Sequence, residues 1–330
     1  MSKKRVIGPF ILLVLAIVFS VTFVPNFATR TNVGYLLLQA VPLLLTATGQ
    51  VLVILTAGID LSVGQTVTMA TVIASVLMQA KNGGVLVAVL VCIVAAVAIG
   101  AANAIMVVRF RLPPFLATLG MTFFLAGMAL YIRAVPGGFI PQSFQSIADT
   151  DWSFVPAAAL VVLVLLAVLA VYVDRSRFGL RARAGGADES GARLAGVPAG
   201  RTKFAAYVAA ALLAMLGGLF IAARTGTGDP LVGGSYQLAS ITAAVLGGAS
   251  LAGGEGTVWG AMMGALVLAM LSNVLNLLAI VQYWQWVLQG SILIIAVAMY
   301  EIRFGRAHAG RRFAGFRPVL AALTAGQVQT

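Results

Sequence analysis

The stretch "VGYLLLQAVPLLLTATGQVLVILTAGIDLSVG", residues 33–64, decides the fold class. Its first part, up to Thr56, carries no charged residue and is long enough to cross a bilayer as a helix, which takes about 20 apolar residues. Gly58 then interrupts the run, and Asp60 follows as the only acidic residue among the first 148. Another apolar run begins directly after it. The pattern predicts two membrane helices separated by a glycine-made break that holds a carboxylate.

The rest of the chain repeats such apolar runs. Of the 330 residues, 61% are hydrophobic and 9% are charged, whereas a soluble domain has roughly 25% charged residues. We therefore predict an all-α polytopic membrane protein with about ten transmembrane helices, some of them short or broken. The expected spans are 7–25, 33–56, 61–80, 85–108, 115–133, 154–173, 204–224, 237–252, 257–279 and 284–302. The eighth is short for a full crossing and is a candidate for a broken or re-entrant helix.

The basic residues set the predicted orientation. With the N-terminus in the cytoplasm, 17 of the 21 lysines and arginines fall inside and four fall outside, as the positive-inside rule expects. Both termini are then cytoplasmic. The start "MSKKRVIGPFILLVLAIVFSV" has no small-x-small cleavage site after it and is interpreted as an uncleaved first span. The net charge of +12 follows the membrane topology and gives no reason to expect a nucleic-acid partner.

One domain accounts for nearly the whole chain. We expect a single transmembrane domain over residues 1–302, with a polar cytoplasmic loop at 174–203, and a basic cytoplasmic tail at 303–330. The only cysteine, Cys92, lies in an apolar run and is expected to be a small buried hydrophobe, and the only histidine, His308, lies in the tail. No metal site, cofactor, catalytic triad or phosphate-binding loop is therefore predicted, so any ATP must be hydrolysed by a separate subunit.

Polar residues within the apolar runs are the candidates for a solute pathway. Asp60 is expected mainly to cap the third span by accepting hydrogen bonds from amides near Ser62 and Val63, with contact to a solute or ion as the other interpretation. Glu255 occupies a similar place after "LAGG" and before a helix. The amides could line the path or hydrogen-bond a neighbouring helix, which is the commoner role. The candidate pathway residues are Gln50, Asp60, Ser62, Asn103, Glu255, Asn273 and Asn276.

A weak internal echo accompanies the first break. "GIDLSVG" (58–64) and "GASLAGG" (248–254) both fit G-x-x-L-x-x-G, 190 residues apart. Transporters often carry internal repeats with interrupted helices at the substrate path. Duplication and chance are both open at this point.

The cytoplasmic segment "AGGADESGARLAGVP" (184–198) predicts a short docking helix. It opens with two glycines, carries acidic residues early and Arg193 late, which suits a helix dipole, and we expect Val197–Pro198 to end it. An ordinary basic loop is the plainer alternative. The candidate docking residues are Gly185, Gly186, Asp188, Glu189, Arg193 and Gly196.

Four stretches together resemble the permease subunits of bacterial ABC sugar importers of the ribose/xylose/galactose type. They are "LTAGIDLSVG" (55–64), "RFRLPPFLATLGM" (109–121), "RARAGGADESGARLAGVP" (181–198) and "LGGASLAGGEGTVWGAMMGALVLAMLSNVLNLL" (246–278). The resemblance implies a multi-pass subunit of the bacterial inner membrane, paired with a second permease copy, surrounded by lipid, and importing a sugar or polyol. It also implies a cytoplasmic ATP-binding subunit, docked on 184–198, and an external solute-binding protein. The family's usual Asn-Glu pair in that loop stands here as Asp188–Glu189.

A different class of transporter is the main rival. An ion-coupled secondary transporter would use Asp60 or Glu255 to bind a proton or cation, and it would need neither an ATPase nor a docking loop. A membrane enzyme or scaffold is the third possibility, and the missing catalytic set counts against it.

Overall fold

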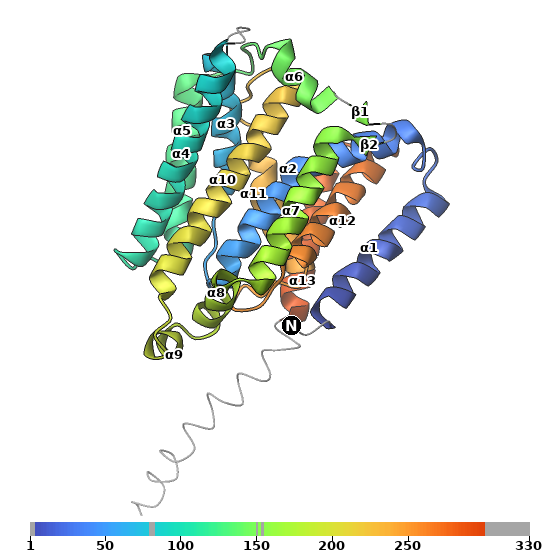
Figure 1. Cartoon of the computed structure of the whole chain (residues 1–330). Helices are drawn as coiled ribbons and strands as arrows, with labels where there is room; N and C mark the ends of the chain where they lie inside the picture. Colours follow the sequence, from blue (N-terminus) through green and yellow to red (C-terminus); the bar gives the residue numbers. More distant parts are fainter. Residues whose placement is uncertain (1–3, 79–82, 150, 153–154, 301–330) are drawn as a thin grey trace, which may run out of the picture.

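The structure, a computed structural model, describes residues 4–78, 83–149, 151–152 and 155–300 (Figure 1). Over these residues the chain forms helices joined by loops, with one two-residue antiparallel strand pair, β1 (Asp151–Trp152) and β2 (Val155–Pro156). The helices are α1 (Lys4–Phe23), α2 (Arg30–Leu55), α3 (Val63–Leu77), α4 (Gly83–Val108), α5 (Pro114–Ile132), α6 (Gln142–Asp149), α7 (Ala157–Arg175), α8 (Arg177–Ala187), α9 (Glu189–Leu194), α10 (Ala199–Thr225), α11 (Gly234–Leu246), α12 (Val258–Leu277) and α13 (Gln282–Tyr300).

Seven helices of the described chain are long and apolar enough to cross a membrane: α1, α2, α4, α5, α7, α10 and α12. The polytopic helical class is confirmed, whereas the predicted count of ten spans is not. α3 has 15 residues and α11 has 13, so at 1.5 Å per residue each is about 20 Å long, against a hydrocarbon core of about 30 Å. The predicted third span, 61–80, is therefore a short helix, and the eighth is short as expected. The tail at 303–330 lies outside the described residues.

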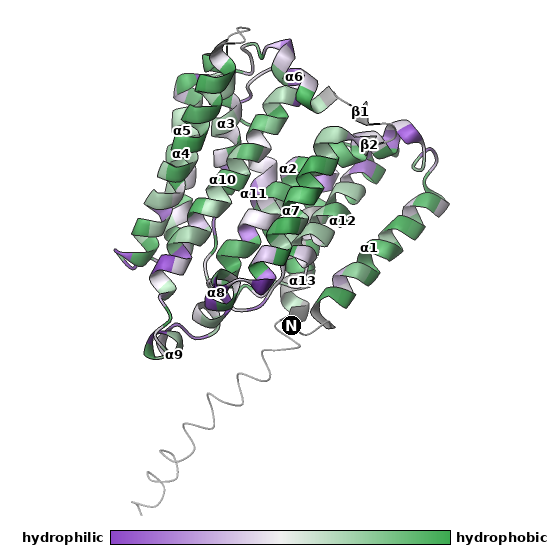
Figure 2. Ribbon diagram, viewed as in Figure 1, coloured by the Kyte–Doolittle hydropathy of each residue, from purple (hydrophilic) through white to green (hydrophobic). Residues whose placement is uncertain are grey.

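Helix α2 forms the centre of the bundle, and its residues from Ala40 to Leu55 are all buried. Small residues permit this close packing: a Cβ on Gly49 would lie 2.9 Å from the Cα of Ala210 in α10, so only glycine fits there. Figure 2 shows the outer helices α1, α4, α5 and α7 mostly in the hydrophobic colour, as expected for surfaces that face lipid. Cys92 is buried on α4, as predicted.

The helix order of the first half recurs in the second. Helices α2 to α5 have 26, 15, 26 and 19 residues, and α10 to α13 have 27, 13, 20 and 19. The break at 56–62 thus corresponds to the segment 226–233 that precedes α11. The echo at 248–254 lies instead between α11 and α12, so the helix order does not pair it with the break at 56–62, and the duplication suggested by G-x-x-L-x-x-G stays a prediction.

The two short helices begin against each other. A Cβ on Gly64 would lie 2.5 Å from the carbonyl oxygen of Gly233, and one on Gly233 would overlap the carbonyl oxygen of Gly64. The amide of Gly233 also donates to Thr68 Oγ1 at 3.0 Å. In Figure 1, α3 lies above α11. Two interrupted helices therefore meet inside the bundle.

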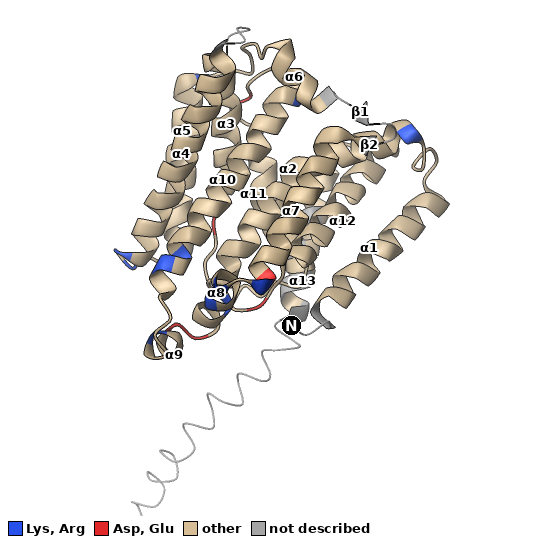
Figure 3. Ribbon diagram, viewed as in Figure 1, with Lys and Arg blue, Asp and Glu red and all other residues tan. Residues whose placement is uncertain are grey.

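The two ends of the bundle differ in their short elements and charge. One end carries α6 and the strand pair, and the other carries α8, α9 and the N-terminus (Figure 1). Figure 3 shows basic residues gathered at the end with α8 and α9. This gathering agrees with the predicted cytoplasmic placement of that end, which stays a prediction.

Candidate functional site

The first candidate site is the break between α2 and α3. Helix α2 ends at Leu55, and Ala57 takes a left-handed conformation with φ 56°. The amide of Gly58 donates to Val53 O at 3.1 Å. A Cβ on Gly58 would lie 2.8 Å from the Tyr207 hydroxyl and 2.9 Å from a methyl of Val53. Any larger residue at this position would have to displace the Tyr207 or Val53 side chain, because α10 packs directly over the turn.

The Asp60 carboxylate is 1% exposed and accepts two hydrogen bonds from one residue. Its Oδ1 accepts from the Ser62 amide at 2.9 Å and from the Ser62 hydroxyl at 2.6 Å. The carboxylate therefore fixes the turn just before α3 through Ser62, which is the N-cap residue of that helix. The expected partner amide near Ser62 is found, whereas no side-chain cap hydrogen bond reaches the amides of α3 itself, so a full cap on the third span is not formed. Within the described part of the chain, no lysine or arginine forms an ion pair with it.

Two buried amides from other helices complete this network. Asn103 on α4 donates through Nδ2 to Ser62 Oγ at 2.8 Å. Gln50 on α2, oriented to satisfy both partners, donates to Asp60 O at 3.0 Å and accepts from Asp60 N at 3.3 Å. Four of the seven predicted pathway residues therefore lie together in one buried polar network, which we call the Asp60 network: Gln50, Asp60, Ser62 and Asn103.

Two residues of this site were missed by the sequence analysis. Thr118 Oγ1 on α5 accepts from the Leu61 amide at 3.1 Å and lies 3.2 Å from Ile59 O. The buried Tyr207 on α10 donates to Ile59 O at 3.4 Å. Threonine and tyrosine are ordinary in membrane helices, so neither stood out. The one usable signal was that Tyr207 adjoins a stripe of small residues on α10.

Asn273 and Asn276 lie elsewhere and tie helices together. Asn273 on α12 and Asn32 on α2 form a reciprocal amide pair, with N–O distances of 3.0 and 2.9 Å. Asn276 accepts from Gln285 of α13 at 2.7 Å. Both contacts match the helix-bonding interpretation. A role for either residue in contacting a solute stays a prediction.

The docking loop folds differently from its sequence-based prediction. Gly185 and Gly186 do not open a new helix but lie buried in the last turn of α8. The next helix, α9, has only six residues and begins after Asp188. It ends at Leu194, followed by Gly196 with φ 75°, so Val197–Pro198 does not end it and Pro198 instead precedes α10. Between α7 and α10 the chain thus forms two short helices joined at Asp188.

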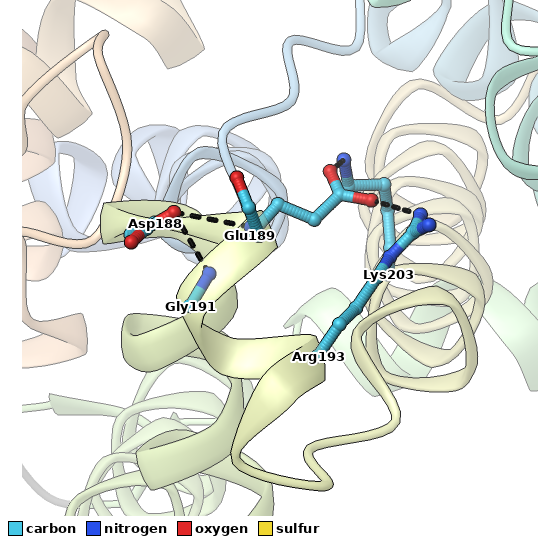
Figure 4. Close-up of polar contacts among 6 residues, drawn as sticks. Asp188, Glu189, Gly191, Arg193 and Lys203 are labelled. Carbon is cyan, nitrogen blue, oxygen red and sulfur yellow. Dashed lines mark hydrogen bonds and ion pairs between the residues drawn. The ribbon is translucent and has the colours of Figure 1, made fainter.

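Asp188 and Glu189 fix α9 in the way that Figure 4 shows. Asp188 Oδ1 accepts from the amides of Ser190 at 3.1 Å and Gly191 at 3.0 Å. The hydrogen bond from Gly191, with help from Ser190, holds the pKa of Asp188 below its ordinary value. Partial burial opposes ionisation of Glu189, but Lys203 at 3.4 Å and Arg193 outweigh it and lower its pKa. Both carboxylates are therefore ionised at neutral pH.

The tip of α9 is apolar and unusually exposed. Leu194 has 91% of its surface accessible, the highest value among the large apolar side chains of the described chain. Next to it, Arg193, Val197 and Pro198 line a hollow of about 560 Å³ that reaches Phe204 on α10 and Val108 on α4. Leu194 and the hollow thus lie together at the tip of the loop for which docking was predicted, and that role stays a prediction.

A glycine contact connects this loop to the Asp60 break. A Cβ on Gly186 would overlap the carbonyl oxygen of Leu55, the last residue of α2, and lie 2.7 Å from the amide of Gly254. The amide of Gly254 donates to that same carbonyl of Leu55 at 3.2 Å. A Cβ added to Gly253 would collide with Ala57, and both Gly253 and Gly254 have positive φ. We call this contact the glycine junction.

Glu255 lies in the loop between α11 and α12, directly after the glycine junction. Its carbonyl oxygen accepts from the Ser250 amide at 3.0 Å. The structure thus places this predicted pathway residue beside the junction, in a loop different from that of the Asp60 network.

Comparison with known proteins gives a consistent set of relatives. A family profile described as branched-chain amino acid transport system / permease component matches residues 32–297. The ribose import permease protein of Escherichia coli is 34% identical over 305 residues, covering 90% of this chain and 92% of its own. The ribose import permease protein of Bacillus subtilis is 33% identical, covering 89% and 92%. The galactose/methyl galactoside import permease protein of Haemophilus influenzae is 29% identical, covering 92% and 96%. No solved structure matches the chain.

Proposed function

Because the chain belongs to the family of permease components described for branched-chain amino acid transport systems, we propose that it is the membrane-spanning subunit of an ATP-driven ABC importer. Its cargo is a sugar or related polyol, since the relatives above are named as ribose and galactose import permeases. The chain is a multi-pass membrane transport subunit and not an enzyme. In this proposal a separate subunit hydrolyses ATP, and a solute-binding protein delivers the cargo at the opposite face.

The glycine junction is the structural observation that supports this proposal most. An ATP-driven permease needs a rigid contact through which a cytoplasmic subunit moves the membrane helices. Helix α8 makes such a contact, because Gly186 abuts the end of α2 and Gly254 at once. Leu55 lies five residues before Asp60, so a displacement of α8 acts directly on the break. We assign α9 and Leu194 to docking the ATP-binding subunit and the glycine junction to transmission.

The Asp60 network then serves to shape the pathway. Its carboxylate already has donors for its Oδ1, and α2, α4, α5 and α10 all hold the break by polar contacts. A break held in this way presents polar backbone within the bundle, as transporters use where a solute passes. Pairing with a second copy of the chain completes the proposed assembly.

Reconstitution tests the proposal. The chain is placed in proteoliposomes with the ATP-binding and solute-binding proteins of the proposed importer, and uptake of labelled ribose, xylose and galactose is measured. Uptake of at least one sugar should need ATP and the solute-binding protein and should survive ionophores. Uptake by the chain alone that collapses with ionophores would instead support the secondary transporter that uses Asp60 or Glu255.

Docking is tested separately by Glu189→Ala and Arg193→Ala. Glu189→Ala removes the contact with Lys203 and so frees α9 from α10, whereas Arg193→Ala removes the ion pair within α9. Both variants should lose stimulation of ATP hydrolysis by the loaded solute-binding protein while still inserting into the membrane, and the loss should be larger for Glu189→Ala. Undiminished stimulation would remove the docking role from α9.

A further inference from the structure

A second polar hollow, which the transport proposal does not use, lies where α7 ends. It has a volume of about 360 Å³ and is formed by the end of α7, the first turns of α8 and the start of α10. Arg177, Arg181 and Arg201 line it together with the aromatic residues Tyr172 and Phe178. Arg177 and Arg181 are four residues apart on α8 and therefore share a face, while Arg201 comes from α10. We call this hollow the arginine pocket.

No acidic residue in the described part of the chain forms an ion pair with the arginines of the pocket. Of the seven basic residues in 174–203, Arg183 pairs with Asp174 at 2.7 Å, and Arg193 and Lys203 pair with Glu189. The remaining four have no ion pair with any described residue. Three of those four line the arginine pocket, and Arg175 is the fourth. The local acidic residues are thus used up elsewhere, which leaves one site open to an anion.

The position of the arginine pocket indicates the kind of anion. Helix α7 is long and apolar enough to cross a membrane and ends at Arg175, so in the proposed topology the pocket lies at the level of the bilayer surface. Tyr172, 57% exposed, has the interfacial place that tyrosine prefers at the end of a span. Above it, α7 exposes an aliphatic face that includes Val161, Val164 and Val168. A ligand with a phosphate in the pocket would therefore have an apolar surface for acyl chains directly beside it.

We propose that the arginine pocket binds the phosphate headgroup of an anionic phospholipid. Guanidinium groups bind phosphate through paired hydrogen bonds, and basic pockets between membrane helices recognise such headgroups. A contact with an ATP-binding subunit is disfavoured because α9 lies farther from the membrane helices than α8 does (Figure 1). The inference rests on the proposed topology only in assigning the site to the cytoplasmic leaflet.

Native mass spectrometry of the delipidated full chain tests this proposal. The chain is titrated with phosphatidylglycerol or phosphatidylcholine, and bound lipid is counted. The wild type should retain more phosphatidylglycerol than phosphatidylcholine. The combined variant Arg177→Gln, Arg181→Gln, Arg201→Gln should lose roughly fivefold in affinity for each arginine removed. Arg175→Gln, an equally unpaired arginine outside the pocket, is the matched control and should bind like the wild type.

Further arms decide between this site and other sources of anion affinity. Replacing the same three arginines by lysine keeps the charge but removes the paired hydrogen bonds, so this variant should bind phosphatidylglycerol more weakly than the wild type and more tightly than the triple glutamine variant. Its remaining preference for phosphatidylglycerol guards against loss through misfolding. Equal loss in Arg175→Gln would reduce the effect to general surface charge and overturn the site. Competition by inorganic phosphate at equal concentration would make it a free-anion site. Unchanged lipid binding in the triple glutamine variant, with ATPase stimulation lost, would assign the arginines to the partner subunit, whatever the outcome for transport itself.

Discussion

Gly186→Ala is the change that most directly tests transmission through the glycine junction. The added Cβ would overlap the carbonyl oxygen of Leu55 and lie 2.7 Å from the Gly254 amide, and both obstacles are backbone atoms that cannot rotate away. Helix α8 must therefore shift by about 1 Å, and such overpacking costs about 1–3 kcal/mol. Alanine within a helix gains about 0.5–1 kcal/mol over glycine, which offsets part of that cost.

A net loss of about 1–2 kcal/mol corresponds to a factor of roughly 5–30 in the population of the correctly packed state. We expect sugar taken up per ATP hydrolysed to fall by that factor in proteoliposomes, while ATP hydrolysis without the solute-binding protein is retained. The thermal unfolding temperature of the purified variant should also be lower than that of the wild type.

Gly185→Ala is the matched control in the same turn of α8. Its Cβ would lie 3.2 Å from the Cβ of Ala199, a side-chain contact that a shift of a few tenths of an ångström relieves. The variant should transport sugar like the wild type. Normal coupling in Gly186→Ala, or equal damage from both substitutions, would refute transmission through the glycine junction.

Three further predictions concern the other polar contacts. Asp60→Asn should keep most uptake because asparagine accepts such hydrogen bonds about as well. Asp60→Ala leaves the buried amide and hydroxyl of Ser62 unpaired at a cost of about 1–3 kcal/mol, which should lower the unfolding temperature. Equal loss of uptake in both variants would show that the charge is needed. Asn273→Ala should lower the unfolding temperature by the equivalent of about 1 kcal/mol, since it leaves the Asn32 amide without its partner, and an unchanged temperature would contradict that. The lowered pKa of Asp188 means that its cap on α9 is complete above the ordinary value of 3.8 and is lost as the pH falls below it. A spin label at Ala195 should therefore gain more mobility on acidification in the wild type than in Asp188→Asn, where only the ion pairs of Glu189 are still lost. Equal mobility changes in the two would contradict the cap.

The predicted break and its carboxylate could be identified from sequence because both signals are local. Gly58 and Asp60 interrupt an otherwise uncharged apolar run, and a carboxylate in such a place needs donors close by in the chain, which Ser62 provides. The amides of Gln50 and Asn103 were found for the same reason, since polar groups in apolar helices are rare enough to stand out.

Other features depended on contacts between distant segments. The echo at 248–254 misled because a short glycine-rich match says nothing about which helices flank it. Gly185 and Gly186 seemed to open a helix, since glycine usually marks a break, but in α8 they are retained for close packing. Thr118 and Tyr207 could not be distinguished from other span residues without knowing that they face Ile59.

The sequence by itself determined which segments lie in the membrane, which lie in water, and where the chain turns. This is because hydropathy, charge and the placement of glycine or proline act over a few residues. It thereby determined a helical membrane protein with a capped break and a charged loop. Only the tertiary structure decided that this loop touches the end of α2 through Gly186, that α3 and α11 start against each other, and that three unpaired arginines share one hollow. These are contacts between helices far apart in sequence, and their specificity comes from the close fit of backbones at glycine and from ion pairs that are formed or left open. Neither leaves a pattern within a single segment.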